Sequence, residues 1–307
     1  LRQSSAYFGG GANCGLEQNQ FYDRCDEQIM RAWWLFLTLF ALPAHALTVT
    51  DDVGNSITLA APAQRIVSLA PSITENLFAI GAGDRIVGTS AASDYPVNDI
   101  PVISDYQSVN LERVAALKPD VIVAWQGGTS PAQLAALTQL NIPVFMHRAT
   151  TLSDIPLSLM RLAQLTGLES TAAPTILDAY QKIKLLKDAP QPNSTAFYPD
   201  GHTPLMTLNR NNWVSDALAR CGARNLFADL SITAPTVNIE TVLQKNPALI
   251  ITPNADLDMW RKWENASAVK NNGLLLVDAD AMNRATLRTL DASAHMCAQI
   301  ATVRSHV

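Results

Sequence analysis

Hydrophobic residues in the first half of the chain form short strand-like runs that alternate with segments of helical spacing. The strand-like runs lie at residues 65–70, 85–88, 121–125 and 143–146. The helical segments, with apolar residues three or four positions apart, lie at residues 73–80 and 131–140. Strands that alternate with helices in this way predict a parallel sheet covered on both faces. An alternating stretch at residues 48–59, interrupted by Gly54-Asn55, predicts a β-hairpin ahead of this sheet.

The second half repeats this style after a long stretch without strand-like runs. Residues 153–189 show helical spacing, interrupted at Gly167 and at residues 171–174, and we interpret them as a stiff helical span. Beyond them we expect strands at residues 196–198 and 274–277 and helices at residues 212–221, 260–270 and 286–304. The predicted fold class is α/β, with two Rossmann-like lobes, each with a central parallel sheet, joined by a long helical connector. The predicted boundaries are residues 47–150, 151–189 and 190–307.

One short pattern occurs twice and supports a duplicated architecture. Asn110, Glu112 and Pro119 recur as Asn238, Glu240 and Pro247, in each case 128 positions later, and an aliphatic run follows each proline. Asn is a good helix N-cap, and a carboxylate in the first turn suits the positive end of the helix dipole. Each copy therefore predicts a short helix followed by a buried strand. Chance similarity between two common helix–strand units is the alternative, but the fold does not require the repeated glutamate.

The N-terminal region has the pattern of an export signal. Residues 32–42 are almost wholly apolar, Met30-Arg31 precede them, and Ala44-His45-Ala46 follow. A charged start, a short apolar core and a small-x-small end predict a signal peptide at residues 30–46, cleaved after Ala46, and a periplasmic product. The apolar run is too short for a comfortable membrane span. Residues 1–29 are interpreted as translated upstream sequence, with a genuine extension as the alternative.

Charge and cysteine content narrow the class of protein further. The net charge is −5 and no cluster of Lys or Arg stands out, which argues against nucleic acid or an anionic membrane surface as the main partner. Cleavage after Ala46 removes Cys14 and Cys25 and leaves Cys221 and Cys297. Two cysteines in an exported protein favour a disulfide over two buried thiols.

The sequence contains no established catalytic motif. A nucleophile elbow, a phosphate-binding loop and an H-E-x-x-H pair are all absent from the sequence. His147 and His202 each follow a predicted strand, so both are weak candidates for a ligand or metal in a cleft, although ordinary loop histidines are more common. Asp278 and Asp280 are better explained as turn or helix-cap residues. We therefore predict a binding protein rather than an enzyme, without a metal or catalytic cofactor, whose ligand lies between the lobes.

Several stretches resemble one branch of a known family. Residues 65–79, Ser93-Asp94-Tyr95-Pro96, residues 110–120 and Ala124-Trp125-Gln126-Gly127-Gly128 resemble the cobalamin-binding members of the periplasmic binding proteins of bacterial ABC importers. These belong to a helical-backbone class that also serves haem and ferric siderophores. The resemblance implies that Glu112 and Glu240 dock onto the two subunits of a twofold-symmetric permease. It also implies a Cys221–Cys297 disulfide and a corrinoid held by aromatic side chains and by residues 280–284.

The expected ligand positions depart from the family pattern. Large aromatic residues of the family are replaced at most of these positions, while Tyr106 is still aromatic and Asp280 and Arg284 are retained. The complete expected ligand-binding set is Ala92, Tyr106, Met206, Ala234, Asp280, Ala281, Met282, Asn283 and Arg284. Cobalamin is the first choice of ligand, and a smaller corrinoid, haem or a siderophore is the alternative. A secreted enzyme on the same scaffold and an adhesion or scaffold protein are the other function classes.

Overall fold

The computed structural model describes residues 46–96, 99–105, 107–186, 194–253 and 256–304. Residues 1–29 and nearly all of the predicted signal peptide therefore lie outside the described residues. Ala46–Val307 forms one compact unit. Within the described residues, no helix is both long enough and apolar enough to cross a membrane.

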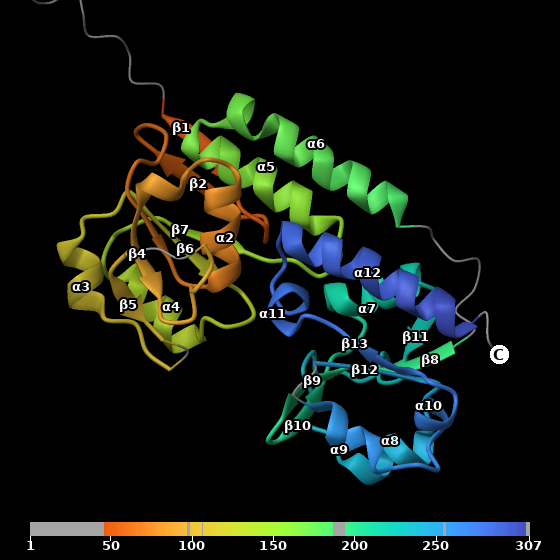
Figure 1. The fold of residues 1–307 in the computed structure, drawn as a ribbon. Coiled ribbons are helices and arrows are strands. Elements are labelled where there is room, and N and C mark those ends of the chain that lie inside the picture. Colours follow the sequence, from red (N-terminus) through yellow and green to blue (C-terminus); the bar gives the residue numbers. More distant parts are fainter. Residues whose placement is uncertain (1–45, 97–98, 106, 187–193, 254–255, 305–307) are drawn as a thin grey trace, which may run out of the picture. The chain divides into compact units, whose positions relative to one another are not determined.

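The first lobe contains a five-stranded sheet in which all neighbouring strands are parallel (Figure 1). Its order is β5-β4-β3-β6-β7. The strands are β3 (Ile66–Ser68), β4 (Ile86–Ser90), β5 (Val102–Ser104), β6 (Val121–Trp125) and β7 (Val144–His147). Its helices are α2 (Pro71–Ala79), the 3-10 turn η1 (Gly83–Arg85), α3 (Leu111–Ala116) and α4 (Pro131–Thr138). The predicted hairpin is confirmed as β1 (Leu47–Thr50) paired antiparallel with β2 (Ser56–Leu59).

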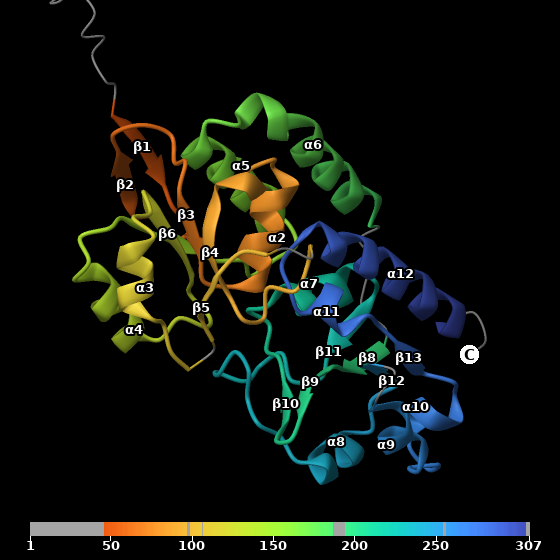
Figure 2. The ribbon, with the colours of Figure 1, turned by 60° about the vertical axis from the view of Figure 1, so that its left-hand side comes forward.

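The two faces of this sheet bury different side chains, as the alternation of a strand requires. Val121 and Val123 of β6 pack in one cluster with α2 and with the helix α5 (Asp154–Thr166). Ile122, between them, packs in another cluster with α3 and α4. Figure 2 shows the sheet between these two groups of helices. The predicted two-sided covering is confirmed.

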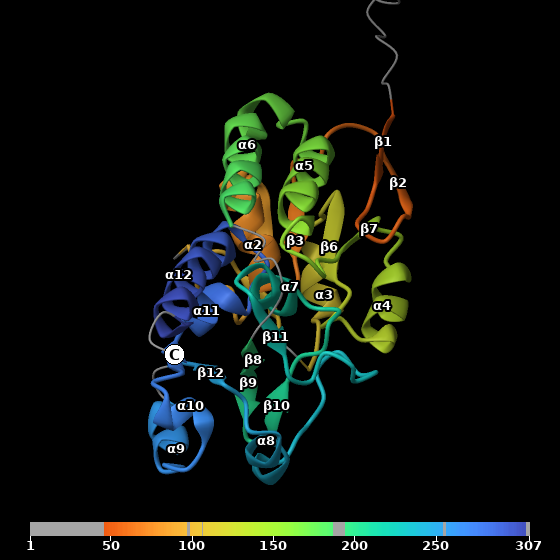
Figure 3. The same ribbon diagram turned by 90° about the vertical axis from the view of Figure 1, so that its right-hand side faces the viewer.

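The second lobe has a four-stranded parallel sheet of order β11-β8-β12-β13. Its strands are β8 (Ser194–Phe197), β11 (Ala223–Asn225), β12 (Leu249–Thr252) and β13 (Leu274–Leu276), with a separate hairpin of β9 (Pro199–His202) and β10 (Leu205–Thr207). One face packs against α7 (Trp213–Arg220) and α12 (Leu287–Arg304). The other packs against α8 (Ile239–Lys245), α9 (Leu257–Arg261) and α10 (Ser267–Lys270). Figure 3 shows the same division.

Three details of the second lobe differ from the sequence prediction. The helix expected at residues 260–270 is two short helices, α9 and α10, because backbone hydrogen bonds of Trp263 and Ala266 close turns between them. The loop expected after β13 contains a short helix, α11 (Ala279–Met282), capped by Asp278. The β9–β10 hairpin was not predicted, because its sequence lacks an alternating apolar pattern.

The region between the lobes is a pair of helices rather than one continuous helix. α5 ends at Gly167, which has φ of +65°, and α6 (Glu169–Leu185) packs against α5 (Figure 1). The predicted break at Gly167 is confirmed, but α6 continues through Pro174. Proline fixes φ near the helical value, and one lost hydrogen bond near a helix start is tolerable when the rest of the helix packs well.

Both lobes share one hydrophobic core. The largest cluster of buried side chains contains Ile66 and Val123 of the first sheet together with Leu249 and Ile251 of the second. α5, α7 and α12 contribute the side chains that connect them. A continuous core of this kind resists independent motion of the two sheets, because separation would expose close-packed apolar surface.

Candidate functional site

The segment after β13 carries most of the expected ligand-binding residues, and the structure divides them into exposed and buried members. Asp280 and Asn283 are exposed, and Arg284 is half-buried. The side chains of Ala281 and Met282 are buried, with Met282 fully enclosed. Trp213 donates its indole N–H to the carbonyl oxygen of Met282 at 2.7 Å, which fixes this turn against α7.

Burial of Ala281 and Met282 corrects the expectation that both side chains face the ligand. A short helix points successive side chains in different directions, and α11 turns these two inward. The sequence stretch could not show this, because the family resemblance places the loop but not the orientation of each side chain. Asp280, Asn283 and Arg284 are the members of this segment that reach its surface.

Asn283 is held by a buried tyrosine of the second sheet. The hydroxyl of Tyr198 donates to Oδ1 of Asn283 at 2.6 Å. Tyr198 directly follows β8 and is fully buried. Burial, together with the negative charges of Asp200 and Asp278, raises the pKa of Tyr198, so its hydroxyl stays protonated and acts as a donor.

Met206 and Ala234 lie on neighbouring segments. Met206 of β10 forms a β-bridge with Thr236, and the backbone N–H of Thr207 donates to the carbonyl oxygen of Pro235 at 3.1 Å. The side chains of Met206 and Ala234 are both half-buried. The structure therefore brings these two expected ligand residues close together, although they are separated in sequence.

In the first lobe, Ala92 is exposed in the loop after β4, and Tyr106 lies outside the described residues.

Trp125, at the carboxyl end of β6, was not among the expected ligand contacts. Its indole ring lies on the backbone of Gly127 and Gly128. A Cβ on Gly127 would lie 2.6 Å from the ring, and one on Gly128 would lie closer still. The two glycines therefore allow the ring to lie flat, and the half-buried indole is fixed at the edge of the sheet where ligands bind in open α/β folds.

Asp200 is a second residue that the sequence did not indicate. It lies on β9, two positions after Tyr198, and it is half-buried. Burial raises the pKa of Asp200 to about 6. Its protonation state therefore changes in the mildly acidic range, where an ordinary aspartate is fully ionised.

His147 does not face a cleft, which corrects its role as a weak ligand or metal candidate. It is 1% exposed, and its Nδ1 lies 2.9 Å from Oδ2 of Asp52 and 2.7 Å from Oγ of Ser158. Arg161 also donates to Asp52, at 2.8 Å. Burial opposes ionisation of Asp52, but these hydrogen bonds outweigh it and lower its pKa. The buried hydrogen bonds of His147 on β7 therefore join this strand to the β1–β2 loop through Asp52 and to α5 through Ser158.

The other histidine candidate, His202, lies on β9, and its side chain is outside the description. Across the residues that the structure describes, no group of three or more His, Cys, Asp or Glu side chains could hold a metal ion. Asp278 is a helix cap, as expected, because Oδ1 accepts a hydrogen bond from the N–H of Ala281 at 3.1 Å.

The repeated glutamates lie on matching helices. Asn110 Oδ1 accepts from the N–H of Arg113 at 2.9 Å, and Asn238 Oδ1 accepts from the N–H of Thr241 at 2.8 Å. Both predicted N-caps are therefore confirmed. Glu112 and Glu240 each occupy the first turn of the capped helix, α3 or α8, and both side chains are exposed.

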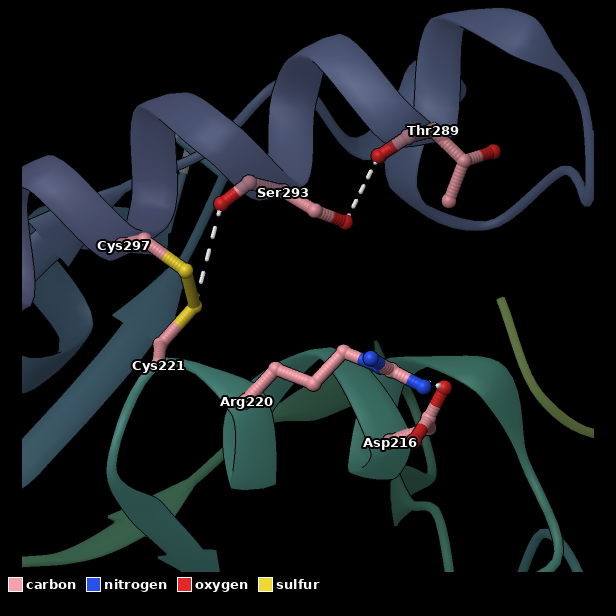
Figure 4. Close-up of a disulfide and its surroundings, with 6 residues drawn as sticks. All are labelled: Asp216, Arg220, Cys221, Thr289, Ser293 and Cys297. Atoms are coloured by element: carbon pink, nitrogen blue, oxygen red, sulfur yellow. Dashed lines mark hydrogen bonds and ion pairs between the residues drawn. A yellow bond between two sulfur atoms is a disulfide. The ribbon is translucent and has the colours of Figure 1, made fainter. Parts of the chain in front are cut away.

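Cys221 and Cys297 form a disulfide (Figure 4). Cys221 directly follows α7, and Cys297 lies within α12. In the same region, Ser293 donates its hydroxyl to the carbonyl oxygen of Thr289 at 2.6 Å. The bond joins two helices that pack on the same face of the second sheet, and the pairing expected from the cysteine count is confirmed.

Comparisons with known proteins agree with this architecture. A family model described as periplasmic binding protein matches residues 66–281. The vitamin B12-binding protein of Vibrio cholerae is 36% identical over 244 residues, which cover 77% of this chain and 88% of that protein. The vitamin B12-binding protein of Yersinia pseudotuberculosis is 34% identical over 281 residues, which cover 88% of this chain and 98% of that protein.

Solved structures give the same picture. The periplasmic vitamin B12 binding protein BtuF of Vibrio cholerae matches with a TM-score of 0.75 at 35% identity, covering 79% of this chain and 98% of that chain. The periplasmic heme-binding protein RhuT of Roseiflexus sp. RS-1, in apo form, matches with a TM-score of 0.66 at 20% identity, covering 78% of this chain and 98% of that chain. At this identity, the match to the heme-binding protein shows the fold alone.

Proposed function

The chain belongs to the periplasmic binding protein family, and we propose that it captures cobalamin or a related corrinoid and delivers it to an ABC import permease. The observation that carries this proposal is its similarity, over most of both chains, to proteins named for binding vitamin B12. The family is a class of binding proteins rather than enzymes, so delivery of a ligand accounts for the absence of a catalytic motif from the sequence. The signal pattern at residues 30–46 supports export to the periplasm.

The proposed ligand site includes exposed or half-buried residues from both lobes. Ala92 and Trp125 are those of the first lobe, and Tyr106, which lies outside the described residues, is kept from the sequence expectation. Met206 and Ala234 belong to the second lobe, together with Asp280, Asn283 and Arg284. Trp125 is an aromatic surface that can stack on a flat macrocycle, because the two glycines beneath it hold the ring in place.

Haem or a ferric siderophore is the second candidate ligand. Two observations favour its inclusion: heme-binding proteins share the fold, and several aromatic positions expected for a corrinoid hold Ala92, Met206 and Ala234 instead. Smaller side chains at these positions enlarge the space for a ligand of different shape and reduce stacking.

Titration of the mature protein, residues 47–307, with cyanocobalamin tests the proposal. We expect saturable heat and quenching of tryptophan fluorescence at micromolar or lower ligand, and Trp125→Ala should weaken binding. Trp263→Ala, at a half-buried tryptophan after α9, serves as the matched control. No binding of cyanocobalamin together with saturable binding of haemin or a ferric siderophore would select the second candidate. Chemical conversion of any of these compounds would point to an enzyme.

We further propose that delivery uses Glu112 and Glu240 as one contact for each subunit of a twofold-symmetric permease. Their support is the exposure of both carboxylates and the similarly capped short helices that present them. A carboxylate that meets an arginine pocket forms strong, directional hydrogen bonds. A protein with two similar lobes can match a twofold partner in this way.

A further inference from the structure

Glu75 is a buried carboxylate of the first lobe that faces the second. It lies on α2 and is 5% exposed. The neighbouring Asn76 donates its side-chain N–H to the carbonyl oxygen of Ala285 at 3.1 Å, so this part of α2 contacts the segment between α11 and α12. A buried carboxylate is costly unless charged or polar partners satisfy it.

Two arginines of the second lobe satisfy Glu75. Arg284 donates from Nη1 to Oε1 at 2.9 Å. Arg288 donates from Nη2 to Oε1 at 2.7 Å and from Nε to Oε2 at 3.1 Å, the two-pronged geometry that guanidinium favours. The hydrogen bond to Glu75 raises the pKa of Arg288, although partial burial opposes it.

The same arginines contact a second element of the first lobe. Nη1 of Arg284 donates to Oδ1 of Asp94 at 2.6 Å, and the guanidinium of Arg288 lies 4.2 Å from the ring centroid of Tyr95. Asp94 and Tyr95 belong to the Ser-Asp-Tyr-Pro motif, which the sequence singled out without a role. Their side chains are exposed, so these contacts are weaker than those of Glu75.

These contacts fix the direction of the Arg284 guanidinium. Nη1 is held by two carboxylates of the first lobe, and a planar guanidinium with one fixed nitrogen has little freedom left. Nη2 lies 3.7 Å from Oδ1 of Asp280, beyond hydrogen-bond distance. This nitrogen, which makes that longer ion pair with Asp280, is a donor that Arg284 can offer to an oxygen acceptor of a ligand.

We propose that Glu75 is a positioning residue. Through Arg284 and Arg288 it holds the start of α12 against the first lobe and directs Nη2 of Arg284 toward a carbonyl or phosphate oxygen of the bound ligand. The ligand part of this inference rests on the proposed corrinoid-binding function. The part that concerns the two lobes does not.

A double-mutant cycle with cyanocobalamin tests the ligand part. Glu75→Gln and Arg284→Gln should each weaken binding by about tenfold or more, because each disrupts a buried charged pair. The double variant should be no more than about twofold weaker than Arg284→Gln alone, since Glu75 acts through Arg284. Asp291→Asn is the matched control. Asp291 lies on α12, as Arg288 does, and its replacement removes an exposed ion pair to Lys182 of α6, so binding should change by less than about twofold. Independent, multiplying effects of the two variants would overturn the proposal.

A measurement without ligand keeps this result separate from the identity of the ligand. Spin labels at the exposed residues Gln126 and Thr233 report the distance between the lobes by pulsed electron paramagnetic resonance. Glu75→Gln should broaden the distance distribution, whereas Asp291→Asn should not. If cyanocobalamin fails to bind the unmodified protein, the proposed function fails, while the distance measurement still decides the role of Glu75.

A second variant covers the case in which Glu75→Gln does not fold. Asp94→Asn with Tyr95→Leu keeps the buried carboxylate and removes only the exposed contacts of the two arginines. We expect several-fold weaker cyanocobalamin binding in the presence of Arg284 and no additional loss in Arg284→Gln. A loss of equal size in both backgrounds would contradict the proposal.

Discussion

Lys118 and Asn246 occupy equivalent positions in the two lobes and share a left-handed backbone, with φ of 46° and 45°. Each directly precedes a proline, Pro119 or Pro247, that leads into a central strand. The repeat thus extends from the asparagine cap of each helix to the left-handed residue after it. Two units that share both ends and the following strand indicate a duplicated structural element rather than chance similarity.

The two left-handed residues should respond differently to glycine. Lys118→Gly should stabilise the protein by about 0.5–1 kcal/mol, because an exposed lysine pays a conformational cost in this region that glycine avoids. Asn246→Gly should destabilise it, because the Asn246 side chain donates to Oγ of Ser267 and accepts from its N–H. Urea unfolding of both variants measures the difference. Equal changes in the free energy of unfolding, in the same direction, would show that the left-handed backbone alone determines the effect of both substitutions.

Removal of both exposed glutamates should separate docking from ligand binding. Glu112→Ala with Glu240→Ala should weaken association with the permease by about tenfold or more, because each charged pair at an interface is costly to break. Ligand affinity should be unchanged, since Glu112 on α3 and Glu240 on α8 are not part of the proposed ligand site. Permease association in detergent or nanodiscs measures the first quantity, and cyanocobalamin titration the second.

Glu169→Ala is the matched control for docking, because Glu169 is another exposed glutamate in the first turn of a helix. It should leave permease association unchanged. Parallel loss of docking and ligand binding in the double variant would indicate a damaged fold and would argue against docking through these two residues.

The disulfide should contribute substantially to stability. Cys221 and Cys297 close a loop with a sequence separation of 76, for which the chain-entropy model gives about 4–5 kcal/mol. We expect the double Cys→Ala variant to lose about 2–5 kcal/mol in denaturant unfolding. Addition of a reductant should destabilise the unmodified protein but not the variant. Equal sensitivity of both proteins would show that the reductant acts elsewhere.

Asp200 should destabilise the protein at high pH. Its folded pKa, about 6, lies above the ordinary value of 3.8, so the protonated form is favoured by folding. The stability that it contributes is complete below about pH 4 and is lost as pH rises through 6. Asp200→Asn should therefore stabilise the protein by about 2–3 kcal/mol at pH 8 and by much less at pH 4. Denaturant unfolding at both values checks this. Asp258→Asn, at an exposed aspartate, should show no such difference.

The sequence predicted the elements whose signals are local. The caps Asn110 and Asn238, the break at Gly167 and the hairpin at Gly54-Asn55 all depend on residues within a few positions of each other, and all are confirmed. The division of residues 260–270 into two helices was missed, because apolar spacing alone does not show where backbone turns interrupt a helix.

The site was harder to predict, because its contacts join distant parts of the chain. Arg284 and Glu75 are 209 positions apart, and no local pattern connects them. Met282 is buried in a turn that Trp213 of α7 fixes through a hydrogen bond to the Met282 carbonyl oxygen, and the elevated pKa of Asp200 depends on burial. Trp125 was missed as well, although its signal is local: Gly127 and Gly128, which lie against its ring, come two and three positions later in the sequence.

α12 has consequences for the order in which the protein can be completed. Arg288 joins it to the first lobe, Asp291 to α6, and Cys297 to α7. Ribosomes deliver a chain from its N-terminus, and α12 follows every strand of both sheets in the sequence, so it emerges after all of them. Each sheet can form its strands earlier, but the contacts that α12 makes between the lobes cannot form until this helix has emerged. Loss of α12 would therefore affect both lobes at once.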